Sequence, residues 1–105
     1  LGKHNYILEQ ILPRLVKRLP CTLLTPVIRY VPEGDFFRPT GHMTFPGTLS
    51  VREETFQRIV EDTARSLKTH GFKKLYLLGD SGGNQVGMSE VATKLQREWG
   101  VEIEV

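Results

Sequence analysis

The feature that most limits the possible folds is an apolar run that stops at a polar, glycine-rich turn near the C-terminal end. Residues 74–79 read Lys-Leu-Tyr-Leu-Leu-Gly, and Asp-Ser-Gly-Gly-Asn follows at once. A helical pattern then begins, with apolar side chains at helical spacing up to Trp99. A strand, a tight turn and a helix in this order are typical of open α/β sheets, which bind ligands where their strands end. We therefore expect any functional site to include Asp80, Ser81 and Asn84.

The rest of the chain alternates between helical and extended patterns. Ser50 to Glu53 has the form of a capping box, which predicts a helix start, and Gly71 and Gly100 stand where helices end. The predicted elements are a helix over 5–19, a strand over 21–30, a loop over 31–50, a helix over 51–70, and then a strand over 73–79, a helix over 84–99 and a strand over 101–105. This alternation predicts an α/β fold, a small three-layer α/β/α sandwich with a mostly parallel sheet. The length allows one domain, residues 1–105.

The loop over 31–50 is unusually long for a small domain, and long loops in compact domains are usually functional or disordered. Its three prolines and three glycines keep it irregular, while the rings of Phe36, Phe37, His42 and Phe45 argue against disorder. We expect an ordered loop that covers a site or packs against another subunit. The second possibility predicts a homo-oligomer.

Composition excludes several classes of partner. The formal charge of +2 is small and the basic residues are scattered, which argues against nucleic-acid binding. No apolar run approaches the roughly 20 residues of a membrane span, so no membrane partner is expected. Cys21 is the only cysteine, so no disulfide can form within the chain, and a cytoplasmic location is favoured. We expect Cys21 to be a small buried side chain.

The segment Gly-Asp-Ser-Gly-Gly over 79–83 has two interpretations that make Ser81 a nucleophile. It resembles the segment around the nucleophile of chymotrypsin-like proteases, but that family is all-β, whereas here a strand precedes the segment and a helix follows. It also fits the nucleophile elbow G-x-S-x-G, whose strand–turn–helix context is present. No histidine or aspartate follows Ser81 to complete a triad, and His42 and His70 precede it. A serine hydrolase using Ser81 is therefore the least favoured alternative.

A third interpretation uses the whole chain. Residues 39–51 read Pro-Thr-Gly-His-Met-Thr-Phe-Pro-Gly-Thr-Leu-Ser-Val, residues 66–72 read Ser-Leu-Lys-Thr-His-Gly-Phe, and residues 79–85 read Gly-Asp-Ser-Gly-Gly-Asn-Gln. In this order and at this spacing, the segments resemble signatures of the creatininase (creatinine amidohydrolase) family. Leu-Gly-Lys-His at 1–4 is similar to the Leu-Gly-Thr-Asp end of an earlier family motif. The resemblance covers essentially all 105 residues.

The resemblance implies helices flanking a parallel sheet, oligomers that are often hexamers, and metal-dependent hydrolysis of C–N bonds in small cyclic or linear amides. One or two zinc or manganese ions would lower the pKa of a bound water and polarise the amide carbonyl. The site residues expected on this basis are catalytic Asp80, Ser81 and His42, substrate-binding Gly82, Gly83 and Asn84, and metal-binding His4 and Asp80.

The chain departs from the family at its expected metal ligands. The histidine of the Gly-Gly-Asn loop corresponds to Ser81, and the aspartate of the earlier motif corresponds to His4. The family's upstream Glu-x-His motif would precede Leu1. We therefore expect an N-terminally truncated or divergent member, lacking the family's first strand and metal motif, with an incomplete metal centre or no metal at all. The alternative is a non-catalytic α/β binding or oligomerisation module.

Each expected site residue also has a structural interpretation. His4 would be an exposed residue at a helix start, and His70 a helix-terminal residue. Asp80 and Ser81 would be turn residues or helix caps. The glycines at 82–83 would be needed for the backbone conformation of the turn.

Overall fold

Helices and short strands alternate along the chain in the computed structural model, which describes residues 2–79, 81–100 and 102–105. The elements are α1 (Lys3–Val16), the 3-10 turn η1 (Gly41–Thr44), α2 (Glu53–Thr69), β1 (Lys74–Tyr76), the 3-10 turn η2 (Gly82–Asn84), α3 (Gln85–Trp99) and β2 (Glu102–Glu104). Helices combined with a parallel sheet agree with the predicted α/β class. Two strands do not establish a three-layer sandwich.

The core lies between the sheet and the helices α2 and α3. Strands β1 and β2 pair in parallel, with Leu75 opposite Ile103, and both side chains are buried. Apolar positions spaced along α2 and α3 complete the cluster, because each helix turns a single stripe toward the sheet. The buried residues of this cluster are Phe56, Val60, Ala64, Leu75, Met88, Val91, Ala92, Leu95 and Ile103. Leu95 is fully buried.

Helices α2 and α3 approach closely at Gly87. A Cβ atom at this position would lie 2.2 Å from Glu53 Oε1 and 3.2 Å from the Phe56 ring. A larger residue here would displace the end of the Glu53 side chain and press on the Phe56 ring, so glycine lets the first turn of α3 pack closely against α2. This contact fixes where α3 begins relative to the sheet.

Charged side chains join the same two helices on their solvent side. Arg65 Nη2 donates to Glu61 Oε1 at 2.7 Å, and its Nη1 donates to Glu98 Oε1 at 2.8 Å. Lys94 Nζ donates to Glu61 Oε2 at 3.0 Å. The hydrogen bonds from Arg65, and then those from Lys94, hold the pKa of the Glu61 carboxyl below its usual range. The part of this network that Glu61 makes therefore contributes its full stabilisation only while Glu61 is ionised.

The predicted glycine end of α2 is confirmed. Gly71 has φ +90°, and its N–H donates to the Lys68 carbonyl at 2.9 Å. The Phe72 N–H donates to the Leu67 carbonyl at 3.2 Å, and both side chains pack against the core. These two bonds form a Schellman motif, which satisfies carbonyls at the helix end and directs the chain into β1.

The predicted capping box at the start of α2 is wrong. Arg52 is the N-cap residue, and no side chain caps the helix there. The Ser50 hydroxyl instead accepts a hydrogen bond from the Glu33 N–H at 2.8 Å and donates to the Gly34 carbonyl at 3.0 Å. Because the hydroxyl is engaged by the loop, it cannot also serve the first amides of the helix.

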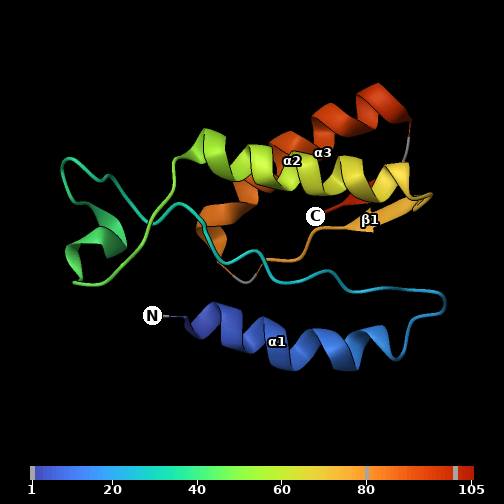
Figure 1. The fold of residues 1–105 in the computed structure, drawn as a ribbon, viewed down its shortest axis with the longest axis horizontal. Coiled ribbons are helices and arrows are strands. Elements are labelled where there is room, and N and C mark those ends of the chain that lie inside the picture. The colour runs from blue at the N-terminus through green and yellow to red at the C-terminus, as the bar shows by residue number, and fades with distance from the viewer. Residues whose placement is uncertain (1, 80, 101) are drawn as a thin grey trace.

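The predicted strand over 21–30 is also wrong. This segment runs extended between α1 and β1 (Figure 1) but has no strand pairing. Pro26 has no N–H to donate to a ladder. Ile28 and Val31 still pack against the core, whereas Leu23 is 74% exposed. Side-chain packing holds this segment, and among the described residues no backbone hydrogen bond joins residues 21–30 to a neighbouring segment.

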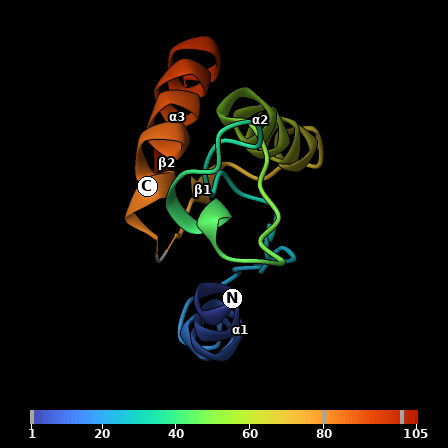
Figure 2. The same cartoon turned by 90° about the vertical axis from the view of Figure 1, so that its left-hand side faces the viewer.

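Helix α1 lies on the far side of this extended segment from α2 and α3, as both Figure 1 and Figure 2 show. It runs through Pro13 and ends at Val16, earlier than the predicted boundary at residue 19. Only Leu12 is buried on this helix, and an ion pair joins Glu9 to Arg29. Cys21, in the turn after α1, is exposed with φ +49°, so its predicted burial is wrong. Among the described residues, no helix has the length and apolar character to span a membrane.

Candidate functional site

One end of the molecule collects the features that parallel α/β sheets use for binding. Strand β1 runs toward this end, and α1, α2 and α3 all begin there (Figure 1). The loop that carries η1 lies at the same end, in front of the core in Figure 2. The carboxyl ends of strands and the N-terminal ends of helices therefore meet, as is typical of ligand sites in this fold class.

The turn after β1 is tied to α3 by one side chain. Gln85 Nε2 donates to the Gly79 carbonyl at 2.9 Å. A Cβ atom at Gly79 would lie 2.7 Å from the Met88 Cε atom, so a larger residue would displace the Met88 side chain. These contacts fix the end of the apolar segment beside the first turn of α3. Asp80, predicted to be catalytic and metal-binding, lies outside the described residues.

The glycines that follow are not needed for the backbone conformation, which corrects that interpretation. Neither Gly82 nor Gly83 has a positive φ. A Cβ atom at Gly82 would meet nothing within 4 Å, and one at Gly83 would meet only Ser81 Oγ at 3.9 Å. Both positions are exposed. The space beside them is open for a ligand or for another part of an assembly.

Ser81 does not cap a helix. Its backbone is extended, with φ −89° and ψ 126°, and its side chain caps neither η2 nor α3. Asn84, the N-cap residue of α3, makes no side-chain capping bond either. Ser81 is half-buried, and within the described residues no hydrogen bond joins it to an imidazole. The structure therefore adds nothing in favour of a serine hydrolase.

Two of the predicted site residues from distant parts of the chain line one pocket. His4, in the first turn of α1, and His42, in η1, both border a pocket of about 380 Å³. Its lining residues are Gly2, Lys3, His4, Glu33, His42 and Phe45. Ser81 and the turn residues at 82–84 are not among them. Among the described site residues, the pocket therefore brings together His4 and His42, while Ser81 and the residues at 82–84 do not line it.

Glu33 was not identified from the sequence, yet it is the partner of His42. His42 Nδ1 lies 2.5 Å from Glu33 Oε2, and the His42 N–H donates to the Glu33 carbonyl at 3.0 Å. Nothing in the spacing of the two residues indicates this pair. The only local signal is glycine at 34 and 41, because both have positive φ and allow the loop to close.

Comparison with known families identifies the family of this chain. The family model described as creatinine amidohydrolase matches residues 1–105, the whole chain. The chain belongs to the creatininase family. Neither the curated proteins nor the solved structures gave a match. The resemblance carried by residues 39–51, 66–72 and 79–85 is thereby confirmed.

Members of the creatininase family generally bind a divalent metal. A catalytic zinc site needs three protein ligands and a water. In residues 2–79, 81–100 and 102–105, no group of three or more His, Cys, Asp or Glu side chains could hold a metal ion. At position 81, a serine hydroxyl stands where the resemblance places a histidine. The described donors do not fit a family-type metal centre.

Proposed function

We propose that this chain is a creatininase-type amidohydrolase domain that hydrolyses C–N bonds in small amides. We also propose that its sheet is the mostly parallel centre of a three-layer α/β/α sandwich. Family membership over the whole chain supports the reaction class. The position of α1 opposite α2 and α3 supports the layer arrangement (Figure 1).

The observation that carries the proposed reaction is the pocket shared by His4 and His42. An imidazole is a general base suited to neutral pH, and it can accept a proton from a water that attacks an amide carbonyl. Lys3 and His4, which line the same pocket, are donors that can stabilise negative charge developing on the carbonyl oxygen. The Phe45 ring, 61% exposed, offers an apolar surface to a small planar amide.

Hydrolysis of a panel of small cyclic and linear amides tests the proposal. The purified protein should release amine and carboxylate from at least one member of the panel, and His42→Ala should lower the rate of that release by about 100-fold or more. Zinc and manganese should be measured in the same preparation. No turnover of any amide, with or without added zinc or manganese, would contradict the proposed reaction.

The second candidate is a non-catalytic α/β binding or oligomerisation module. It is favoured by the donor set, since the described carboxylates and imidazoles do not gather into a metal centre. Amide turnover, with zinc and manganese measured in the same preparation, separates the two candidates. Near-stoichiometric zinc or manganese together with amide turnover would make the non-catalytic module wrong.

We further propose that the chain forms a homo-oligomer in the cytoplasm. Large apolar side chains on α1, the extended segment, the loop and α3 are open to solvent, a pattern that marks interaction surfaces. The most exposed of them are Tyr6 (65%), Leu23 (74%), Phe37 (84%), Phe45 (61%), Leu49 (69%) and Val86 (67%). The single cysteine is the basis for the location.

A further inference from the structure

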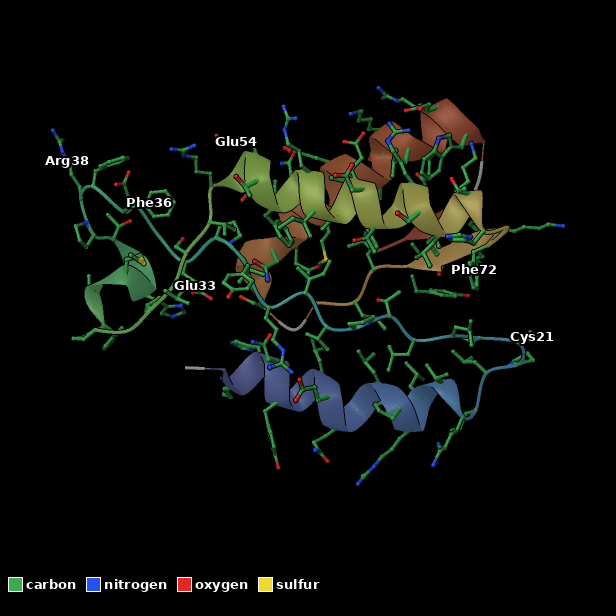
Figure 3. All side chains as sticks on the ribbon, in the orientation of Figure 1. Cys21, Glu33, Phe36, Arg38, Glu54 and Phe72 are labelled. Atoms are coloured by element: carbon green, nitrogen blue, oxygen red, sulfur yellow. The ribbon has the colours of Figure 1, made fainter. Side chains whose placement is uncertain are left out.

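The loop that carries His42 closes on itself around Glu33. Figure 3 shows Glu33 where the extended segment passes into the loop with η1. Its N–H donates to Ser50 Oγ at 2.8 Å, and its carbonyl accepts the His42 N–H at 3.0 Å. The backbone of Glu33 is therefore held by two hydrogen bonds, one to the Ser50 hydroxyl and one from the His42 N–H, in addition to any contact of its side chain.

Two glycines allow this closure. Gly34 has φ +139°, and a Cβ atom there would lie 2.0 Å from the Thr40 carbonyl oxygen. Gly41 has φ +53°, and its Cβ atom would lie 3.0 Å from the Glu33 carbonyl oxygen. Both contacts are with backbone, which cannot move aside as a side chain could. Glycine at these two positions thus permits the loop conformation that places Glu33 beside His42.

The side-chain bond between the two residues determines which ring nitrogen of His42 carries the hydrogen. A carboxylate has only acceptor oxygens, so at 2.5 Å from Glu33 Oε2 the His42 Nδ1 must carry the hydrogen. In the neutral ring the lone pair is then on Nε2. The His42 side chain is 63% exposed and that of Glu33 29%, so the imidazole is accessible while its partner is more sheltered.

We infer that Glu33 is a positioning residue that holds His42 as the Nδ1–H tautomer and leaves Nε2 as the proton acceptor of the pocket. This inference rests on the proposed function. In the hydrolysis, Nε2 takes one proton from water as the water oxygen bonds to the amide carbonyl carbon. The C–N bond then breaks, and the same proton passes from Nε2 to the departing nitrogen. Glu33 gains no proton, but it fixes the ring orientation and stabilises the imidazolium.

The first test is the tautomer of His42, read from long-range ¹H–¹⁵N correlations of the three imidazoles. The His4 and His70 signals are identified with His→Gln variants at those positions. Wild-type His42 should be the Nδ1–H tautomer in its neutral form. Glu33→Gln keeps the shape but lets an amide donate to Nδ1, so it should convert the ring to the Nε2–H tautomer. An Nε2–H tautomer in the wild type, or no change in the variant, overturns the inference.

The second test is kinetic, on an amide that the wild type hydrolyses. Glu33→Gln should lower kcat by about 100-fold or more, the range of general base catalysis, with KM within about twofold. Glu54→Gln, an exposed carboxylate in the first turn of α2, is the matched control and should leave both parameters unchanged. A tautomer change in Glu33→Gln without loss of kcat overturns the inference. If the wild type hydrolyses no amide, the proposed function fails, while the tautomer measurement still decides whether Glu33 positions His42.

Discussion

The Ser50 hydroxyl stabilises the loop that carries His42 and does not cap α2. Its position before Glu53 predicts a helix cap, but its oxygen accepts the Glu33 N–H and it donates to the Gly34 carbonyl. The sequence pattern of a capping box does not reveal that the Ser50 hydroxyl also has hydrogen-bond partners in the loop. Ser50 therefore belongs to the structure that holds the histidine pocket, and not to α2.

Replacing Ser50 with alanine tests this assignment. Ser50→Ala leaves the half-buried Glu33 N–H without its acceptor, so it should reduce the free energy of unfolding by about 1 kcal/mol. Amide hydrogen exchange should become faster at Glu33 and stay unchanged in the first turn of α2. Faster exchange only in that turn would instead support the prediction that Ser50 caps α2.

Replacing glycine with alanine should change the free energy of unfolding by different amounts at two sites. Gly34→Ala places a Cβ atom 2.0 Å from a carbonyl oxygen at φ +139°, so we expect a loss of about 1–3 kcal/mol in the free energy of unfolding. Gly82→Ala meets nothing within 4 Å, and its stability should stay within about 0.5 kcal/mol of wild type. Chemical denaturation measures both.

The Gly82→Ala variant also tests the substrate-binding role predicted for the glycine turn. If Gly82 contacts substrate, Gly82→Ala should raise KM although the fold is unaffected. A variant with unchanged stability and unchanged KM would remove Gly82 from the predicted site. Strong destabilisation of Gly82→Ala would show that the turn is more constrained than its open surroundings indicate.

At the scale of elements, the segments with strong periodicity were predictable. The stripe along α2 and the glycine ends of α2 and α3 follow from side-chain spacing and backbone freedom, which are local properties. The prediction of a strand over 21–30 was wrong, because a strand needs a hydrogen-bonding neighbour as well as β-branched residues. The pairing of Glu33 with His42 depends on how an irregular loop closes, which no periodic pattern encodes.

The contact between α2 and α3 should weaken in acid in a specific way. The folded-state pKa of Glu61 is lowered, chiefly by its hydrogen bonds to Arg65 and then to Lys94. A depressed pKa contributes stability above the unfolded-state value of 4.5, and that contribution is lost as the pH falls through the folded value. Wild type should therefore lose more stability below about pH 4.5 than Glu61→Gln does. Parallel acid dependence of the two unfolding free energies would contradict this.

At the scale of the whole molecule, the exposed apolar side chains predict association. We expect light scattering at micromolar concentration to give a mass above that of the 12.0 kDa chain. Leu23→Asp, at a position 74% exposed on the extended segment, should shift the mass toward the monomer without unfolding α2 and α3. A wild-type monomer under these conditions would count against the homo-oligomer.

At the scale of the whole molecule, we propose that the active centre lies at the end of the sheet where His4 of α1 and His42 of η1 line one pocket. His70 is the matched control, because it is exposed at the opposite end of α2. The most direct measurement is the rate of amide hydrolysis by wild type, His42→Ala and His70→Ala, each shown to be folded. The account predicts turnover by wild type and His70→Ala and a loss of about 100-fold or more in His42→Ala. Equal rates for all three proteins would contradict it.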